Sequence, residues 1–301
     1  MENPVENIKT SLGTLCFSGT KAEAAKLSEI AGIAATSPLA VELFARTNLE
    51  GYTFGFTSLF PTTAGEIHHE KRDIRFNARF GNLTLAPYLV HEIAHVEQER
   101  LGLSPFRPGI SVADIILEDR LGEAAAYALG LEAAWEMSSH HEGRWAQTFM
   151  ETPALSLVFQ MEMRKGDTPE TRKRARTKAF LGFFSDIQAD YCENAITSLV
   201  EKMPPRTLRQ SLATPNRSSG EYFEILERQG FTNLVRHIPE MTFDQLSLRG
   251  VNRFTTNRLL AASRKADIPE EALSALPQER HFLPRQAAYA AIACLALLPV
   301  F

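Results

Sequence analysis

The 301-residue sequence lacks most features that mark secreted or nucleic-acid-binding proteins. Its three cysteines, Cys16, Cys192 and Cys294, are far apart and odd in number. They exclude a disulfide framework and a C-x-x-C metal knuckle, and such sparse cysteine is typical of a reducing compartment. The formal net charge is −4, so no overall basic surface points to nucleic acid as a partner. The sequence contains no P-loop and no G-x-G-x-x-G motif.

Long apolar runs are scarce as well. Residues 1–20 have no basic start followed by an apolar stretch, so we expect no secretory signal and a cytoplasmic location. The strongly apolar run at 287–301 has only 15 residues and includes Pro299, which is short for a membrane span. We therefore predict a buried terminal helix there and no membrane partner, with a tail anchor as the alternative.

The informative stretch is the H-E-x-x-H motif at His91, Glu92 and His95. On a helix, His91 and His95 lie one turn apart on the same face, where two neutral imidazoles can hold one divalent metal. Glu92 lies beside them, within reach of a water molecule whose pKa the metal would lower. The pattern therefore predicts zinc as the cofactor and Glu92 as the catalytic base. The alternative is an amphipathic helix with two histidines on its polar edge.

A catalytic zinc needs a third protein ligand, and the residues after the motif exclude one source of it. A metzincin continuation would place glycine at 98 and histidine at 101, where this chain has Gln98 and Leu101. A carboxylate from a later helix is the remaining common choice, and Glu123 is preferred because the surrounding alanines allow two helix backbones to approach closely. The carboxylates considered are Asp114, Glu118, Asp119, Glu123 and Glu132.

Three further residues are candidates for supporting the site. Asp119 and Tyr127 share a helix face with Glu123, one turn before and after it, and either could orient an imidazole or a metal-bound water. Tyr191 could stabilise an oxyanion if its helix crosses the cleft, and the alternative is a buried tyrosine whose hydroxyl bonds elsewhere.

The patterns predict an α+β fold that is mainly α. Alternating residues at 52–57, followed by Ile67, Ile74 and Phe76, indicate a small antiparallel sheet directly before the motif helix, and this is the only convincing β region. An exposed edge of such a sheet could align an extended peptide by main-chain hydrogen bonds, although a purely structural sheet is equally compatible with the pattern.

Capping signals and proline positions predict the helices. Thr20 to Glu23 has the form of a capping box, and Ser37-Pro38 reads as an N-cap followed by a first-turn proline. Further helices are expected at 84–101, from 111 or 113 to 137, and from 167 to 203. Pro204-Pro205 marks the best boundary, so we predict a catalytic domain at 1–203 and a helical C-terminal subdomain at 204–301.

Two segments together resemble a known family. Val90-His91-Glu92-Ile93-Ala94-His95, followed by Glu123-Ala124-Ala125-Ala126-Tyr127-Ala128, resembles the gluzincin class of zinc metallopeptidases. It is most similar to bacterial metallopeptidase domains with a second motif of the E-A-x-A-x-A type. In those domains a short β region ends in an I-x-h-N strand, which Ile74-Arg75-Phe76-Asn77 matches. The resemblance covers roughly 37–199.

The resemblance implies zinc bound by His91, His95 and Glu123, with Glu92 as the catalytic base. One departure is Ala125, where an acidic residue is frequent in the family. The leading hypothesis is a zinc-dependent hydrolase that cleaves peptide or protein substrates. The rival hypothesis is a non-catalytic binding or regulatory protein on a degenerate metallopeptidase scaffold.

Overall fold

The structure is a computed structural model, and it describes residues 5–58, 63–105, 107, 109–140, 153–184, 186–231, 251–269, 272–273 and 276–277. The chain forms two compact units, one made of 1–100 and 126–160 and the other of 101–125 and 161–301. The division passes through a single continuous helix, α4 (Val112–Ser138). The two units do not test the boundary predicted at 203/204 between a catalytic domain and a C-terminal subdomain, and that boundary stays a prediction.

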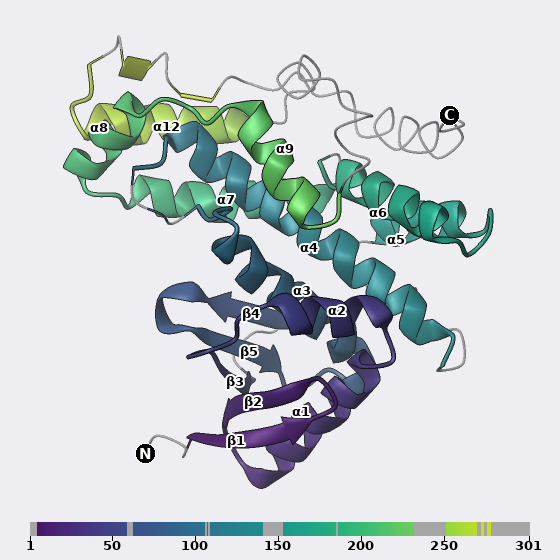
Figure 1. The fold of residues 1–301 in the computed structure, drawn as a ribbon. Helices are drawn as coiled ribbons and strands as arrows, with labels where there is room; N and C mark the ends of the chain where they lie inside the picture. Colours follow the sequence, from purple (N-terminus) through teal and green to yellow (C-terminus); the bar gives the residue numbers. More distant parts are fainter. Residues whose placement is uncertain are drawn as a thin grey trace. The chain divides into compact units, whose positions relative to one another are not determined.

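The first unit contains a five-stranded sheet with the strand order β1-β2-β3-β5-β4 (Figure 1). Its strands are β1 (Val5–Thr10), β2 (Gly13–Ser18), β3 (Thr53–Thr57), β4 (Gly65–His68) and β5 (Asp73–Asn77). The pairs β1–β2 and β4–β5 are antiparallel, whereas β2–β3 and β3–β5 are parallel. The sheet is therefore mixed, which corrects the antiparallel prediction. The long helical connection between β2 and β3 returns the chain in the parallel direction.

The β1–β2 hairpin corrects the prediction that the region after residue 51 is the only convincing β region. Its turn contains Gly13 at a φ of 115°, a conformation that favours glycine, and the Thr10 hydroxyl donates to the Gly13 carbonyl at 2.8 Å. Leu15 and Phe17 are buried and alternate with Cys16. The period-2 signal was thus present, but in a shorter apolar run than that of β3.

Besides the second half of α4, three helices from the part of this unit before residue 101 accompany the sheet: α1 (Lys21–Ala34), α2 (Pro38–Arg46) and α3 (Asn82–Arg100). The capping box of α1 and the Ser37 N-cap of α2 are confirmed, because the Thr20 and Ser37 side chains accept from the backbone N–H groups of Glu23 and Ala40. Helix α1 packs against β1 and β3, and α3 packs against β4. Every residue of α3 from Leu85 to Ala94 is buried, so the motif lies in the interior except for its last histidine, His95.

The second unit is helical. Besides the first half of α4 it contains α6 (Pro169–Phe183), α7 (Ile187–Glu201), α8 (Pro205–Ala213), α9 (Ser219–Arg228) and α12 (Arg253–Lys265), while α5 (Pro153–Met163) begins before its boundary. The single helix predicted from 167 to 203 is wrong. Two helices occupy that stretch because Asp186 caps a new one, its carboxylate accepting from the Gln188 N–H at 3.0 Å.

The predicted class, α+β and mainly α, is confirmed. Helix α4 confirms the helix predicted from 111 or 113 to 137. Within the described ranges no single helix is long and apolar enough to cross a membrane, and α1 with α2 passes that test only as a pair bent by 114°. The helix predicted at 287–301 lies outside the described residues.

Candidate metal centre

Helix α3 brings the two motif histidines together. The ring centroids of His91 and His95 are 4.7 Å apart, and the rings are arranged edge to face. The Nε2 atoms of the two rings are 3.1 Å apart. His91 and Glu92 are buried, whereas His95 is partly exposed. The two Nε2 atoms thus point at a common region next to the helix, as the spacing in the sequence predicted.

Gln98 orients His95, and the sequence reasoning missed this role. The Nδ1 of His95 lies 2.8 Å from Oε1 of Gln98, an oxygen that only accepts, so Nδ1 is the donor. A neutral His95 then carries its proton on Nδ1, which leaves the Nε2 lone pair for a metal. The signal was available, because residues three apart on a helix are neighbours.

Helix α4 supplies the carboxylate that completes the group. One ligand atom each from His91, His95 and Glu123 lie within 4.8 Å of one another. It is the one group of three or more potential metal ligands found among the described residues. Glu123 is thus the carboxylate, of the five considered in the sequence, that joins the two histidines.

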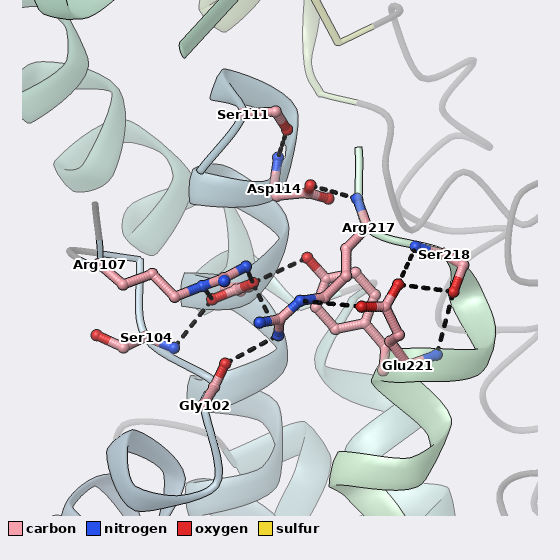
Figure 2. A network of polar contacts seen from close by, with 10 residues as sticks. Gly102, Ser104, Arg107, Ser111, Asp114, Arg217, Ser218 and Glu221 are labelled. Carbon is pink, nitrogen blue, oxygen red and sulfur yellow. Dashed lines mark hydrogen bonds and ion pairs between the residues drawn. The ribbon is translucent and has the colours of Figure 1, made fainter. Parts of the chain in front are cut away.

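Other acids of α4 lie in different surroundings. Glu118 accepts hydrogen bonds from the Ser104 N–H and from Arg107. The Asp114 carboxylate accepts from the backbone N–H of Arg217 (Figure 2). Glu132 is buried, with 4% of its surface exposed. These three acids are outside the group formed with the histidines.

Asp119 and Tyr127 both lie next to the candidate ligands. The Tyr127 ring packs edge-on against His91, with the ring centroids 4.6 Å apart. Burial raises the pKa of Asp119 well above its usual value, the charge of Glu123 raises it further, and Arg120 partly opposes both. Burial likewise raises the pKa of the Cys192 thiol, with Glu123 and Asp119 adding to the shift. Acidic groups are therefore gathered around Glu123, and their ionisation there is disfavoured unless a cation binds beside them.

Glu92 lies against the edge strand of the sheet. A Cβ atom added to Gly65 of β4 would come within 2.6 Å of Oε1 of Glu92, so only glycine allows this approach. The strand backbone and the Glu92 carboxylate are thus in direct contact.

The remaining candidate, Tyr191, is on α7 with 60% of its surface exposed. No described contact joins it to the histidines, and its role stays a prediction. His68 and His69 are adjacent in the sequence and point to different partners. His68 faces Glu66 at 3.3 Å, and His69 faces Glu99 at 2.9 Å.

The donor set fits zinc. Two imidazole nitrogens and one carboxylate oxygen are the protein ligands of an open catalytic zinc site, which keeps a fourth position for water. Two nitrogens at about 2.0–2.1 Å from one ion lie roughly 3 Å apart, which matches the 3.1 Å between the Nε2 atoms.

A buried H-E-x-x-H helix facing a glutamate on a second helix is the arrangement of a metallopeptidase-type site. The comparison with known families agrees with this class. Residues 12–218 match the family described as "Putative metallopeptidase family (DUF6782)", and because the match covers more than half of the chain, the chain belongs to that family. The predicted resemblance to a metallopeptidase family is thereby confirmed. No curated protein and no solved structure matches the chain.

Proposed function

We propose that the chain is a zinc-dependent hydrolase that cleaves peptide bonds. His91, His95 and Glu123 would hold the zinc ion, and Glu92 would act as general base. The observation that carries the proposal is the convergence of one ligand atom from each of the first three residues within 4.8 Å. Membership of a metallopeptidase family supports peptide or protein as the substrate.

The chemistry divides between the ion and the chain. A bound zinc supplies a Lewis acid, which polarises the scissile carbonyl and makes water more acidic. Glu92 accepts a proton from the attacking water and delivers it to the leaving amine. Its buried carboxylate, packed against Gly65, is preorganised for this transfer. Gln98 holds the His95 ring with Nε2 available for coordination.

The position of β4 supports an extended substrate. In the described sheet β4 is an edge strand with β5 as its hydrogen-bonded neighbour, and its first residue contacts Glu92. An extended peptide that pairs with the other edge of β4 would run alongside the catalytic base. This arrangement would present the peptide bond to Glu92 with little ordering of the protein.

Two variants test the proposal. Glu92→Gln should keep stoichiometric zinc and lose turnover of a quenched fluorescent peptide library, whereas His91→Ala should lose both. Zinc is measured by elemental analysis after dialysis, and activity with and without a chelator. Glu42→Gln, an exposed change on α2, is the matched control and should behave as wild type. Wild-type-like hydrolysis by Glu92→Gln would refute the assigned role. Bound zinc without hydrolysis by the wild type would favour the non-catalytic alternative.

A further inference from the structure

A polar cluster that the proposed mechanism does not use lies at the end of the motif helix. Its members are Tyr52, His69 and Glu99. The Tyr52 hydroxyl donates to Oε2 of Glu99 at 2.7 Å, and Nδ1 of His69 lies 2.9 Å from the same oxygen. Because a carboxylate only accepts, Nδ1 of His69 is the donor. The hydroxyl oxygen of Tyr52 is 3.3 Å from Nδ1 of His69, so the three side chains form one compact group.

The cluster connects the motif helix to the edge strand. Glu99 is on α3, four residues after His95, and so one turn further along the face that carries the motif histidines. His69 directly follows β4 and opens the short 3₁₀ turn at His69–Lys71. At the other end of β4, Gly65 packs against Glu92 of the same helix. Strand β4 is therefore held to α3 at both of its ends.

The charge states of the cluster suit a permanent contact. Burial raises the pKa of Glu99, but the hydrogen bonds from Tyr52 and His69 outweigh that effect, and the pKa is lowered overall. Burial and the neighbouring Glu99 carboxylate both raise the pKa of Tyr52 above its usual value. Glu99 is thus ionised and Tyr52 protonated at neutral pH, so the tyrosine stays a donor. Tyr52 itself is fixed, with only 4% of its surface exposed.

A strand of four residues with one paired neighbour has little stability of its own. Its alignment depends on what it packs against, here the two ends fixed on α3. We propose that Tyr52, His69 and Glu99 are positioning residues that hold β4 against the motif helix and thereby set the affinity for an extended peptide beside Glu92. This inference rests on the proposed function for its substrate, but the clamping of β4 is measurable without any substrate.

The test compares three changes in the full chain. His69→Leu removes the donor to Glu99, whereas His69→Asn retains an amide N–H close to the position of Nδ1. Glu70→Gln is the control, because Glu70 is the exposed next residue of the same turn. Hydrogen exchange of the backbone amides of 65–69 reports on β4, bound zinc reports on the metal site, and steady-state kinetics separate KM from kcat.

We expect His69→Leu to speed exchange in β4, to leave bound zinc unchanged, and to raise KM about fivefold with kcat nearly constant. His69→Asn should restore both exchange and KM, and Glu70→Gln should match the wild type. Unchanged exchange in His69→Leu would overturn the inference, whatever the kinetics show. Faster exchange accompanied by a loss of kcat and an unchanged KM would overturn the link to substrate affinity. If the zinc-loaded wild type hydrolyses no peptide, the proposed function fails, and the exchange experiment still decides whether the cluster clamps β4.

Discussion

Two acidic clusters begin at adjacent residues of α4 and differ in how their charge is balanced. Glu118 is surrounded by cations and donors, since Arg107, Arg217 and Tyr222 all contact its carboxylate. Asp119 instead faces a second acid, Glu123, whose charge raises the pKa of Asp119. The two clusters lie on different sides of one helix, because successive residues point about 100° apart.

The difference separates a structural cluster from the acids of the candidate metal centre. The arginines around Glu118 are part of the chain, so the carboxylate is balanced as soon as the chain folds. Asp119 and Glu123 instead bring two acids together, with Arg120 offsetting part of the repulsion, and Glu123 is the acid grouped with the two imidazoles. An added cation would relieve that repulsion, so ion binding should stabilise the folded chain through Asp119 and Glu123. It should leave the interactions of Glu118 unchanged.

The largest effect is expected from removing the acid that joins the histidines. Glu123→Gln should lower zinc affinity by more than about 100-fold, because even residues that only support a ligand cost about 10–100-fold. The zinc-free variant should be no less stable than the zinc-free wild type, since repulsion with Asp119 is removed. Zinc titration and urea denaturation measure the two quantities. Exposed Glu224→Gln on α9 is the control. Zinc affinity equal to wild type would remove Glu123 from the site.

Breaking the Glu118 cluster should lower stability without changing zinc affinity, the opposite of what is expected for Glu123→Gln. Arg217→Leu should destabilise the chain by about 1.5–3 kcal/mol at pH 7, because an ion pair to a buried carboxylate and a hydrogen bond to the Gly102 carbonyl are lost. Zinc affinity of the folded protein should not change. Urea denaturation and zinc titration test both statements, and a weakened metal site with unchanged stability would reverse the comparison.

The loss in Arg217→Leu should also depend on pH. Burial already raises the pKa of Glu118 although Arg107 and Arg217 oppose it, and removing Arg217 raises it further. When the pKa of a carboxyl group is higher in the folded chain than in the unfolded chain, ionisation of the group lowers the stability of the folded chain. This loss of stability is fully present above the folded-state pKa. It disappears below the unfolded-state pKa, which is about 4.3 for glutamate. The difference in unfolding free energy between Arg217→Leu and the wild type should therefore narrow as the pH falls from 7 to 4. Arg209→Leu is the control, because Arg209 donates to backbone carbonyls and not to a carboxylate. Its difference in unfolding free energy from the wild type should stay constant over the same pH range.

A smaller effect is expected from the residue that orients His95. Gln98→Leu keeps the side-chain size but removes the acceptor for Nδ1, and zinc affinity should fall about 10–100-fold. Competition with a chromogenic chelator measures the affinity, and the urea midpoint of the zinc-free protein checks the fold. An unchanged zinc affinity would show that Gln98 does not act through His95.

The smallest change removes one hydroxyl from the Glu118 cluster. Tyr222 is fully buried and its hydroxyl donates to Glu118 at 3.0 Å, so Tyr222→Phe should cost about 1 kcal/mol of stability. Zinc binding should be unaffected. A stability loss equal to that of Arg217→Leu would show that the hydroxyl, and not the cation, balances Glu118.

Local features of the fold were predictable to within a few residues. The capping box at Thr20, the N-cap at Ser37 and the helices α3 and α4 follow from side-chain chemistry and periodicity over one or two turns. The choice of Glu123 rested on a local feature too, the small residues around it. The break at Asp186 was missed because the apolar pattern continues on both sides of a single capping residue.

Contacts between distant segments were not predictable. Nothing near β3 indicates that it pairs with β2 and β5 in parallel, and His69 and Glu99 meet across 30 residues of chain. The approach of β4 to Glu92 at Gly65 is likewise visible only in the folded chain.

By itself, the sequence determined the motif helix, the helix that carries Glu123, and the residue types able to bind a metal. These depend on hydrogen bonds and side-chain spacings within about four residues, which the chain order specifies directly. Only the tertiary structure decided how the strands of the sheet pair, which strand borders Glu92 and which side chains hold that strand. Those choices depend on how buried surfaces pack, and packing brings together residues whose separation along the chain carries no information about their distance in space.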